Sequence, residues 1–296
     1  MVYNKLLIAE SQNLRCAPHG LVPPQFPVFS KPIYNMRGMG TGSCIIRSLE
    51  QWHIRQAPGH MWMDLLSGEH LSTDVAVIEG KPVWWRHASG KPLKAGMFDY
   101  WTVHDEARPE IEAYCGRWLS RKLDGYTGIV NFETIGGKII ECHLRFTDQW
   151  PDLYGEGWIE AVVALYSNGV WRFKDADRRT GYSVVLFAAH GMRYEIDRTR
   201  VHELIDECPE VSSIQITFRD DKPLEAHAMP PGGFRLAIVN CSDLDVGFEV
   251  RYRLASRFRS VGRIRVPRGD RTKRATQRGR TKRVAQKRPT NRAAQG

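Results

Sequence analysis

The sequence predicts an α+β protein in which antiparallel strand pairs dominate and helices lie between them. Strand-like segments at 72–78 and 82–86 are joined by Glu79-Gly80, a strong turn signal for a β-hairpin. Two more strand-like segments meet at Gly136-Gly137. Between these hairpins, residues 109–123 carry apolar side chains at helical spacing. Hairpins mixed with helices, without an internal repeat, indicate an α+β fold rather than a doubly wound α/β sheet.

The remaining elements follow from capping signals and from the spacing of apolar residues. We expect helices within 1–20 and over 48–56, the second capped by Ser48, and strands at 26–31, 44–47 and 60–66. Residues 90–100 are expected to form a loop. Further along, the pattern predicts helices at 158–166, 201–207 and 244–255 and strands at 183–187, 213–218 and 235–239.

The net charge of +10 is unevenly distributed along the 296 residues. Fifteen of the 43 Lys and Arg residues lie in 257–296, where Asp270 is the single acidic residue, so the other 28 bases and 32 acids give 1–256 a net charge of −4. A strongly basic segment with few large apolar side chains cannot fold alone, and we expect 257–296 to be a disordered tail. Such a tail can neutralise phosphates, which makes nonspecific nucleic acid or another acidic surface a candidate partner. A solubilising or tethering extension is the simpler alternative.

The sequence also argues against several classes of protein. No run of eighteen apolar residues occurs, so no membrane span is expected. The first residues lack the charged and then apolar pattern of a secretory signal. Six cysteines are scattered without a CxxC pair, which indicates a reduced, cytoplasmic setting and argues against a structural zinc site.

The most informative segment runs from Glu133 to Arg145 and reads as two strands joined by Gly136-Gly137. Side chains alternate between the two faces of a strand, so Glu141, His143 and Arg145 are expected to share one face. Carboxylates, an imidazole and a guanidinium gathered together are suited to a divalent metal ion and a phosphate.

Whether Glu133 joins this group depends on the register of the hairpin. A two-residue turn pairs Glu133 near Ile140 and directs it away from Glu141. A three-residue loop at 135–137, or a bulge with the same effect, pairs Glu133 near Ile139 and places it on the shared face. The metal-site interpretation requires this second register. The alternative interpretation is a cluster of salt bridges on an exposed sheet face.

Three segments precede this hairpin. A strand at 26–31 ends in Lys31-Pro32, a glycine-rich loop follows at 37–43, and the segment 63–69 ends in Gly68-Glu69. Together with the hairpin, this order resembles the ATP-grasp superfamily of carboxylate–amine and carboxylate–thiol ligases, over about residues 1–166. The resemblance implies two α+β lobes, built on mostly antiparallel sheets, that clamp a nucleotide between them.

The resemblance also implies which residues would bind ATP. Lys31 would grip the nucleotide phosphates, and Lys5 occupies the place of the family's first phosphate-contacting lysine. The glycine-rich loop would close over the β- and γ-phosphates, because glycine lets backbone N–H groups approach phosphate oxygens closely. The backbone from Asp64 to Leu66 would bind adenine and Glu69 the ribose hydroxyls, although Glu69 alone is typical of a solvated turn. The members of the loop are Arg37, Gly38, Gly40 and Gly42.

The hairpin would supply the metal ligands and the catalytic arginine. Glu133 and Glu141 match the family's acids, and Arg145 matches the arginine that contacts the reacting phosphate or intermediate. His143 stands where the family has Asn. Mg²⁺ is the implied ion, but an imidazole suits Mn²⁺, Zn²⁺ or Fe²⁺ better, so Mn²⁺ is an alternative. A further alternative is that His143 does not bind the metal ion and instead donates a hydrogen bond to a phosphate or a substrate.

By the same resemblance, residues 1–66 are a small nucleotide-binding lobe, 67–180 a large lobe with the metal site, and 181–256 a C-terminal α+β subdomain. The family's usual N-terminal domain, which helps bind the acceptor, has no counterpart. A partner protein or residues 181–256 would take over its role, or the chain is a reduced form. Residues 148–152 are expected to line the acceptor pocket.

The implied activity is that of an ATP-dependent ligase. It would activate a small-molecule carboxylate as an acyl phosphate, which an amine or another nucleophile then attacks. Two alternatives remain open: an ATP-grasp module that binds nucleotide without ligating anything, and a nucleic-acid-associated protein anchored by 257–296.

Overall fold

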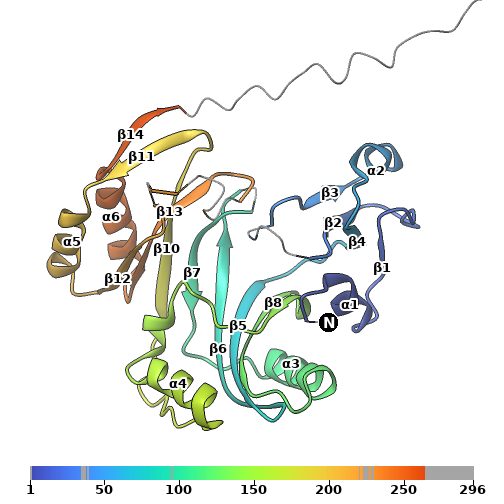
Figure 1. Cartoon of the computed structure of the whole chain (residues 1–296), viewed down its shortest axis with the longest axis horizontal. Coiled ribbons are helices and arrows are strands. Elements are labelled where there is room, and N and C mark those ends of the chain that lie inside the picture. Colours follow the sequence, from blue (N-terminus) through green and yellow to red (C-terminus); the bar gives the residue numbers. More distant parts are fainter. Residues whose placement is uncertain are drawn as a thin grey trace, which may run out of the picture. The chain divides into compact units, whose positions relative to one another are not determined.

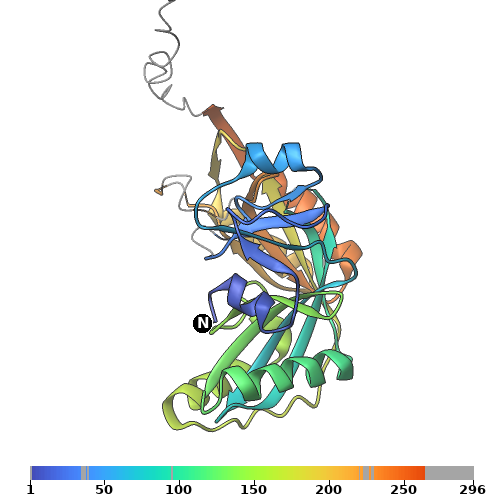
Figure 2. The same ribbon diagram turned by 90° about the vertical axis from the view of Figure 1, so that its right-hand side faces the viewer.

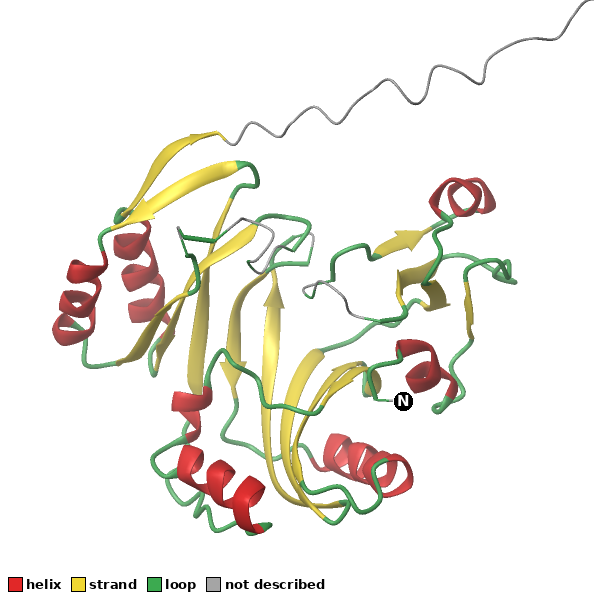
Figure 3. Ribbon diagram, viewed as in Figure 1, coloured by secondary structure: helices red, strands yellow, loops and turns green. Residues whose placement is uncertain are grey.

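The computed structural model describes residues 2–34, 38, 40–94, 96–219, 221–222, 227 and 230–263. They form two antiparallel sheets, a two-stranded ribbon and helices packed against the sheets (Figures 1 and 3). This arrangement confirms the predicted α+β class. None of the helices within the described residues has both the length and the hydrophobicity that a membrane crossing needs.

The larger sheet has eight strands in the order β12-β13-β10-β7-β6-β5-β8-β9, and every neighbouring pair is antiparallel. One of its edges is β9, which carries two of the candidate metal ligands, Glu141 and His143, while the third, Glu133, lies on the neighbouring β8. In chain order the strands are β5 (His70–Ile78), β6 (Lys81–Pro92), β7 (Phe98–Val103), β8 (Gly128–Ile135), β9 (Lys138–His143), β10 (Gly181–Ala188), β12 (Val211–Ile216) and β13 (Phe234–Cys241).

The smaller sheet has the order β1-β4-β2-β3. Its strands are β1 (Cys16–Pro18), β2 (Val28–Pro32), β3 (Cys44–Ile46) and β4 (His60–Asp64), and the helices α1 (Lys5–Glu10) and α2 (Leu49–Arg55) accompany them. The Ser48 side chain accepts a hydrogen bond from the Gln51 N–H, which confirms the predicted cap of α2. The helix expected within 1–20 is confined to α1, because the chain turns after Glu10 and enters β1.

Helices cover both faces of the larger sheet, and alternation along β8 decides which side chains face the site. Phe132 packs in a cluster with Trp118 of α3 (Pro109–Lys122). Ile129 packs in a different cluster, with Trp158 of α4 (Trp158–Asn168). Glu133 lies an even number of positions from Ile129 and therefore faces away from α3. The helices α5 (Val201–Glu207) and α6 (Leu244–Ala255) cover β10, β12 and β13, and a 3₁₀ turn, η1 (Pro151–Tyr154), precedes α4.

The loop predicted at 90–100 is shorter than expected, and its predicted bounds are wrong at both ends. Strand β6 continues to Pro92 and β7 begins at Phe98. Gly90 lies within β6, where an added Cβ atom would approach Phe98 Cδ1 to 2.5 Å. The glycine is therefore required for the close packing of an aromatic ring, whereas the sequence pattern suggested a turn.

Two predicted boundaries also differ from the structure. The eight-stranded sheet passes through the boundary at 180/181, because β10 pairs with β7. The segment predicted as a tail from 257 begins with a strand, β14 (Phe258–Arg263), which pairs with β11 (Met192–Ile196). The basic composition obscured this strand, which Phe258 anchors in the core beside α6. Residues 264–296 lie outside the described residues.

Candidate functional site

The turn between β8 and β9 has two residues, with Ile135 opposite Lys138. Gly136 and Gly137 both have positive φ angles, of 54° and 77°. Two left-handed positions in a row are typical of a tight hairpin turn and favour glycine at both. At Gly136 an added Cβ atom would lie 2.3 Å from the Ser67 carbonyl oxygen, so the turn also needs glycine for space.

A bulge then places both acids on one face. Thr134 lies opposite Ile139, but Glu133 lies opposite Glu141, so Ile140 is an extra residue in β9. The expectation that Glu133 shares a face with Glu141 is confirmed. The expected pairing of Glu133 with Ile139 is wrong, because a two-residue turn and a bulge achieve together what a longer loop would have done.

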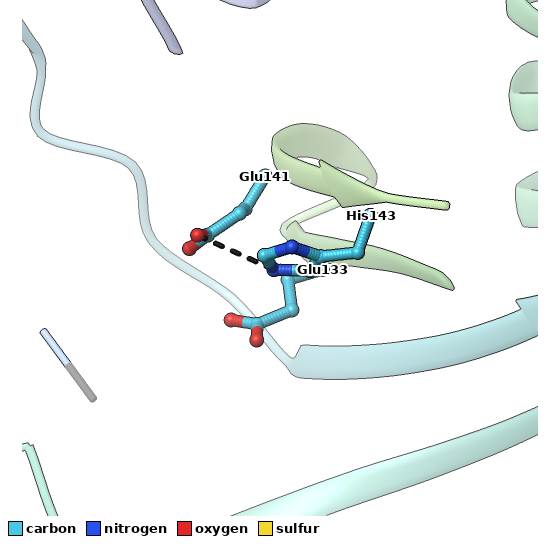
Figure 4. A group of neighbouring side chains, drawn as sticks. All are labelled: Glu133, Glu141 and His143. Atoms are coloured by element: carbon cyan, nitrogen blue, oxygen red, sulfur yellow. Dashed lines mark ion pairs between the residues drawn. The ribbon is translucent and has the colours of Figure 1, made fainter. Parts of the chain in front are cut away.

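Glu133, Glu141 and His143 gather their ligand atoms within 4.8 Å of one another (Figure 4). The Nε2 atom of His143 lies 3.3 Å from Oε1 of Glu141. All three side chains are partly buried, which keeps them accessible to a small ion. Two carboxylates and an imidazole in this arrangement fit a divalent cation, with coordination positions left open for other ligands.

His70 is a neighbour of this cluster that the sequence interpretation missed. Its Nε2 atom lies 3.3 Å from Oε2 of Glu133, and its ring packs edge-on against Phe98 and Trp101. The expected strand began only at Ser72, so His70 was left outside it. Extending the alternation of β5 back by two residues would have placed His70 on the face of Ser72, which pairs with Glu133.

Two lysines reach the hairpin from the first 66 residues. Lys5 opens α1, and its Nζ atom lies 3.3 Å from Oε1 of Glu141 with only 8% of the side chain exposed. Lys31 is the penultimate residue of β2 and donates a hydrogen bond of 2.9 Å to the Ile140 carbonyl oxygen. Burial, together with the nearby Lys5 ammonium, lowers the Lys31 pKa to about 8. In Figures 1 and 2 α1 lies beside the β8–β9 hairpin, as these contacts require.

A pocket of about 370 Å³ opens at this point. It brings together five of the residues expected to contact ATP or the metal ion: Lys5, Gly38, Glu141, His143 and Arg145. Arg145 follows the end of β9 and is exposed, with its Nη1 group donating to the Phe146 carbonyl at 2.9 Å. Arg145 therefore lines the pocket from a loop rather than from the strand.

Other predicted nucleotide contacts lie in ordinary structural surroundings. The Asp64 carboxylate pairs with Arg15 at 2.8 Å, and the Asp64 N–H donates to the Arg15 carbonyl. Leu66 packs against the core cluster that contains Met63, and Glu69 is exposed. These residues line β4 and the connection to β5, and their expected contacts with adenine and ribose stay predictions.

The glycine-rich segment is described only in part. Arg37 lies outside the described residues. The carbonyl of Gly38 accepts from the Thr41 N–H and that of Gly40 from the Ser43 N–H, so the chain forms consecutive turns. Gly42 has a φ angle of 82°.

A buried carboxylate fixes the loop that follows Arg145. Asp74 on β5 is 1% exposed and accepts hydrogen bonds from the Thr147 N–H at 2.9 Å, the Tyr154 hydroxyl at 2.7 Å and the Asn131 amide at 2.7 Å. Burial raises the Asp74 pKa, while these donors favour the ionised form. Asp74 thus ties both η1 and the loop before it to the sheet.

A second arginine faces the same loop. Arg235 on β13 is 9% exposed and lies 3.7 Å from the carboxylate of Asp148, three residues after Arg145. Its Nε atom has no hydrogen-bond partner among the described residues. Burial lowers the Arg235 pKa. A buried cation with incomplete neutralisation was not expected from the sequence, because β13 otherwise reads as a continuous apolar strand.

No protein-family model matches the chain, and no curated protein sequence matches it. Solved structures resemble it. The L-amino acid ligase from Bacillus licheniformis matches 88% of this chain and 72% of its own length, with a TM-score of 0.58 and 12% identity. Phosphoribosylamine–glycine ligase from Thermotoga maritima matches 87% and 75%, with a TM-score of 0.55 and 16% identity.

A third similar structure contains ligands. The biotin carboxylase domain of the Hydrogenobacter thermophilus 2-oxoglutarate carboxylase, solved with MgADP and bicarbonate, matches 88% of this chain and 67% of its own length. The TM-score is 0.57 and the identity 11%. Similarity at these identities establishes the fold, so the chemistry has to be argued from the side chains.

Proposed function

Because the chain has the ATP-grasp fold, we propose that it is an ATP-dependent ligase that activates a substrate carboxylate as an acyl phosphate for attack by an amine or another nucleophile. The observation that carries this proposal is the pocket where Glu141 and His143 lie beside Lys5, Gly38 and Arg145. Phosphoryl transfer depends mainly on positioning and on neutralising phosphate charge, and these residue types supply both. The structural neighbours are ligases of this general kind.

The nucleotide would lie between the smaller sheet and the β8–β9 hairpin. Lys5 already presents its ammonium in the pocket and would contact a phosphate. Lys31 would do so after exchanging the Ile140 carbonyl for a phosphate oxygen. The other proposed contacts are Arg37, Gly38, Gly40 and Gly42 for the phosphates, Asp64 to Leu66 for adenine, and Glu69 for the ribose.

Glu133, Glu141 and His143 would hold a divalent cation, Mg²⁺ or Mn²⁺, beside the phosphates. When bound, this ion would supply neutralisation of the phosphate charge. His70 would hold the Glu133 carboxylate in place from behind, and Lys5 would do the same for Glu141 while contributing positive charge.

The substrate carboxylate would bind on the far side of the pocket, near Arg145 and Arg235. Both guanidiniums adjoin the loop that Asp74 anchors, and Asp148 links that loop to Arg235. Arginine binds carboxylates with paired hydrogen bonds. A panel of acids and amines, assayed by the release of ADP, would identify the acid and the nucleophile.

The decisive experiment is Glu141→Ala. The variant loses a ligand of the proposed cation, so we expect metal-dependent ADP release to fall at least about 100-fold while circular dichroism stays native. Glu156→Ala, which removes an exposed acid before α4, should behave like the unmodified protein. Full turnover in a folded Glu141→Ala protein would overturn the proposal.

A second candidate is a module that binds ATP without ligating anything. His143 in place of the family's Asn, and the engagement of both lysines with β9, favour it. Calorimetry that detects Mg-ATP binding, together with no ADP formation across the whole panel of acids and amines, would establish this second function.

The remaining partners are also proposals. Residues 264–296 contain twelve Lys and Arg against Asp270, so they are the candidate site for an acidic partner such as nucleic acid. Truncation should be made after Arg263, because β14 belongs to the folded part. A cytoplasmic location fits the six free cysteines.

A further inference from the structure

We propose that the cluster of Glu133, Glu141 and His143 binds a divalent transition-metal ion in preference to Mg²⁺, with His143 as the ligand that makes the distinction. The class of ion is one that accepts a nitrogen ligand, such as Mn²⁺ or Co²⁺. This inference rests on the proposed function only where it gives the bound ion a role beside the phosphates of ATP. Its test needs no nucleotide.

The first argument is the chemistry of the donors. Mg²⁺ strongly prefers oxygen ligands in regular octahedral geometry, whereas imidazole is a common ligand of Mn, Fe, Co and Zn. His143 points toward both carboxylates (Figure 4), and its Nε2 atom lies 3.3 Å from Glu141. An ion that contacts both acids would therefore meet this nitrogen.

The second argument is the support behind the ligands. Groups that hydrogen-bond a metal ligand orient it and tune its affinity. The His70 ring packs edge-on against Phe98 and Trp101, and its Nε2 atom lies 3.3 Å from the Glu133 carboxylate. Glu133 is thus held in position by a group that lies outside the three-residue cluster.

The competing explanation is a simple side-chain contact, in which the His143 imidazole pairs with Glu141 and no metal ion is bound. It predicts that removing the imidazole changes metal binding very little. The proposal predicts the opposite, so the two can be separated by one substitution, His143→Asn, which keeps a polar side chain and restores an oxygen ligand.

The experiment titrates the full-length protein with CoCl₂, and separately with MgCl₂, in the absence of ATP. Binding of Co²⁺ is followed by its visible absorption, which reports the ligands directly, and Mg²⁺ by competition. We expect His143→Asn to weaken Co²⁺ binding at least about tenfold and to shift the absorption band, with a change below about threefold for Mg²⁺. The ratio of the two effects is decisive, because an all-oxygen site also prefers Co²⁺ over Mg²⁺.

Two further variants complete the test. His53→Asn changes an exposed histidine on α2 and should bind Co²⁺ like the unmodified protein. Glu133→Gln should weaken the binding of both Co²⁺ and Mg²⁺. An unchanged Co²⁺ affinity and spectrum in a folded His143→Asn protein would overturn the proposal.

Failure of this inference can be told apart from failure of the proposed ligase. Co²⁺ binding that depends on His143, without ADP release for any acid and amine, supports the metal preference and contradicts the ligase. Normal Mg²⁺-dependent ADP release in His143→Asn, with Co²⁺ binding unaffected, contradicts the metal preference and leaves the ligase standing.

Discussion

The Nζ atom of Lys31 donates a 2.9 Å hydrogen bond to the carbonyl oxygen of Ile140, the extra residue of the β9 bulge. The bulge rotates Glu141 onto the face of Glu133, so Lys31 bonds the residue on which the cluster depends. Next to it, the Gln12 side chain bonds both the N–H and the carbonyl of Ile139, at 2.8 and 2.7 Å. Residues from the first 31 positions thus cover the open edge of the larger sheet, where unpaired backbone groups would otherwise remain.

Lys31→Met should change how stability depends on alkaline pH. The folded protein releases the Lys31 proton at about pH 8, whereas the unfolded chain holds it up to about pH 10.5. The unfolded state therefore binds more protons between these values, and the free energy of unfolding should rise by about 2 kcal/mol from pH 8 to 10 through this group.

The measurement is urea unfolding at pH 8 and pH 10. Lys31→Met should lack this rise, while Lys94→Met, which removes an exposed lysine, should retain it. An equal rise in both variants would show that Lys31 titrates normally.

Asp74→Ala should loosen the loop that carries Arg145. The substitution leaves the Thr147 N–H, the Tyr154 hydroxyl and the Asn131 amide without their buried acceptor. Each unsatisfied donor costs about 1–3 kcal/mol, partly offset because a buried carboxylate is no longer desolvated, so we expect a net loss of about 3 kcal/mol.

Hydrogen exchange across 144–154 should accelerate in Asp74→Ala more than exchange in α3, which Asp74 does not contact. Asp177→Ala, at an exposed site, is the matched control. Unaltered protection of 144–154 in a folded Asp74→Ala protein would show that the loop is held by other contacts.

The sequence alone predicted the parts of this fold whose signals are local. Ser48 before α2, Glu79-Gly80 between β5 and β6, and Gly136-Gly137 between β8 and β9 each mark a cap or turn with its own chemistry, and all three appear where expected. The shared face of Glu133 and Glu141 was predictable as one of two registers. A bulge was one of the expected routes to this register, but its position at Ile140 was not predictable, because the Lys31 contact to that residue spans 109 residues.

The missed features depend on contacts between distant segments. His70 supports the site because it contacts Glu133, and Asp74 does so because it accepts a hydrogen bond from Thr147. Both contacts join segments that the sequence does not place side by side. Gly90 resembled a turn residue because its close neighbour, Phe98, lies on the next strand. Local pattern therefore predicted many of the elements, whereas β14, the start of β7 and the support of the site needed the tertiary structure.

His87→Gln should reduce the sensitivity of the protein to mild acid. His87 is 1% exposed, and its two ring nitrogens contact the Thr73 hydroxyl at 3.0 Å and Glu112 at 3.1 Å. Burial lowers its pKa, although Glu112 acts in the opposite direction. The unfolded chain therefore binds more protons just below pH 6.5, and the free energy of unfolding falls as the pH drops through this range.

The test compares urea midpoints at pH 7.5 and 5.5. The decrease should be smaller in His87→Gln than in His53→Gln, whose histidine is exposed. It should persist in part, because burial also lowers the pKa of His19 and His104. The same decrease in both variants would mean that His87 does not contribute.

Arg235→Met should leave the free protein equally stable or more stable. The Arg235 guanidinium is buried, its Nε atom lacks a partner among the described residues, and its carboxylate partner, Asp148, is 76% exposed. Replacing an incompletely compensated buried charge by an apolar side chain of similar length is often neutral or stabilising, by about 1–4 kcal/mol. Arg251→Met is the contrasting variant. Arg251 is paired with Asp99, so its replacement should lower the stability of the protein.

The same pair of variants separates a structural role of Arg235 from a role in substrate binding. If Arg235 neutralises the substrate carboxylate, Arg235→Met should raise the KM for the acid at least about tenfold, with little change in the KM for ATP. Thermal unfolding and ADP-release kinetics on the two proteins supply both readouts. A destabilised Arg235→Met protein with an unchanged KM would assign this buried charge to the fold alone.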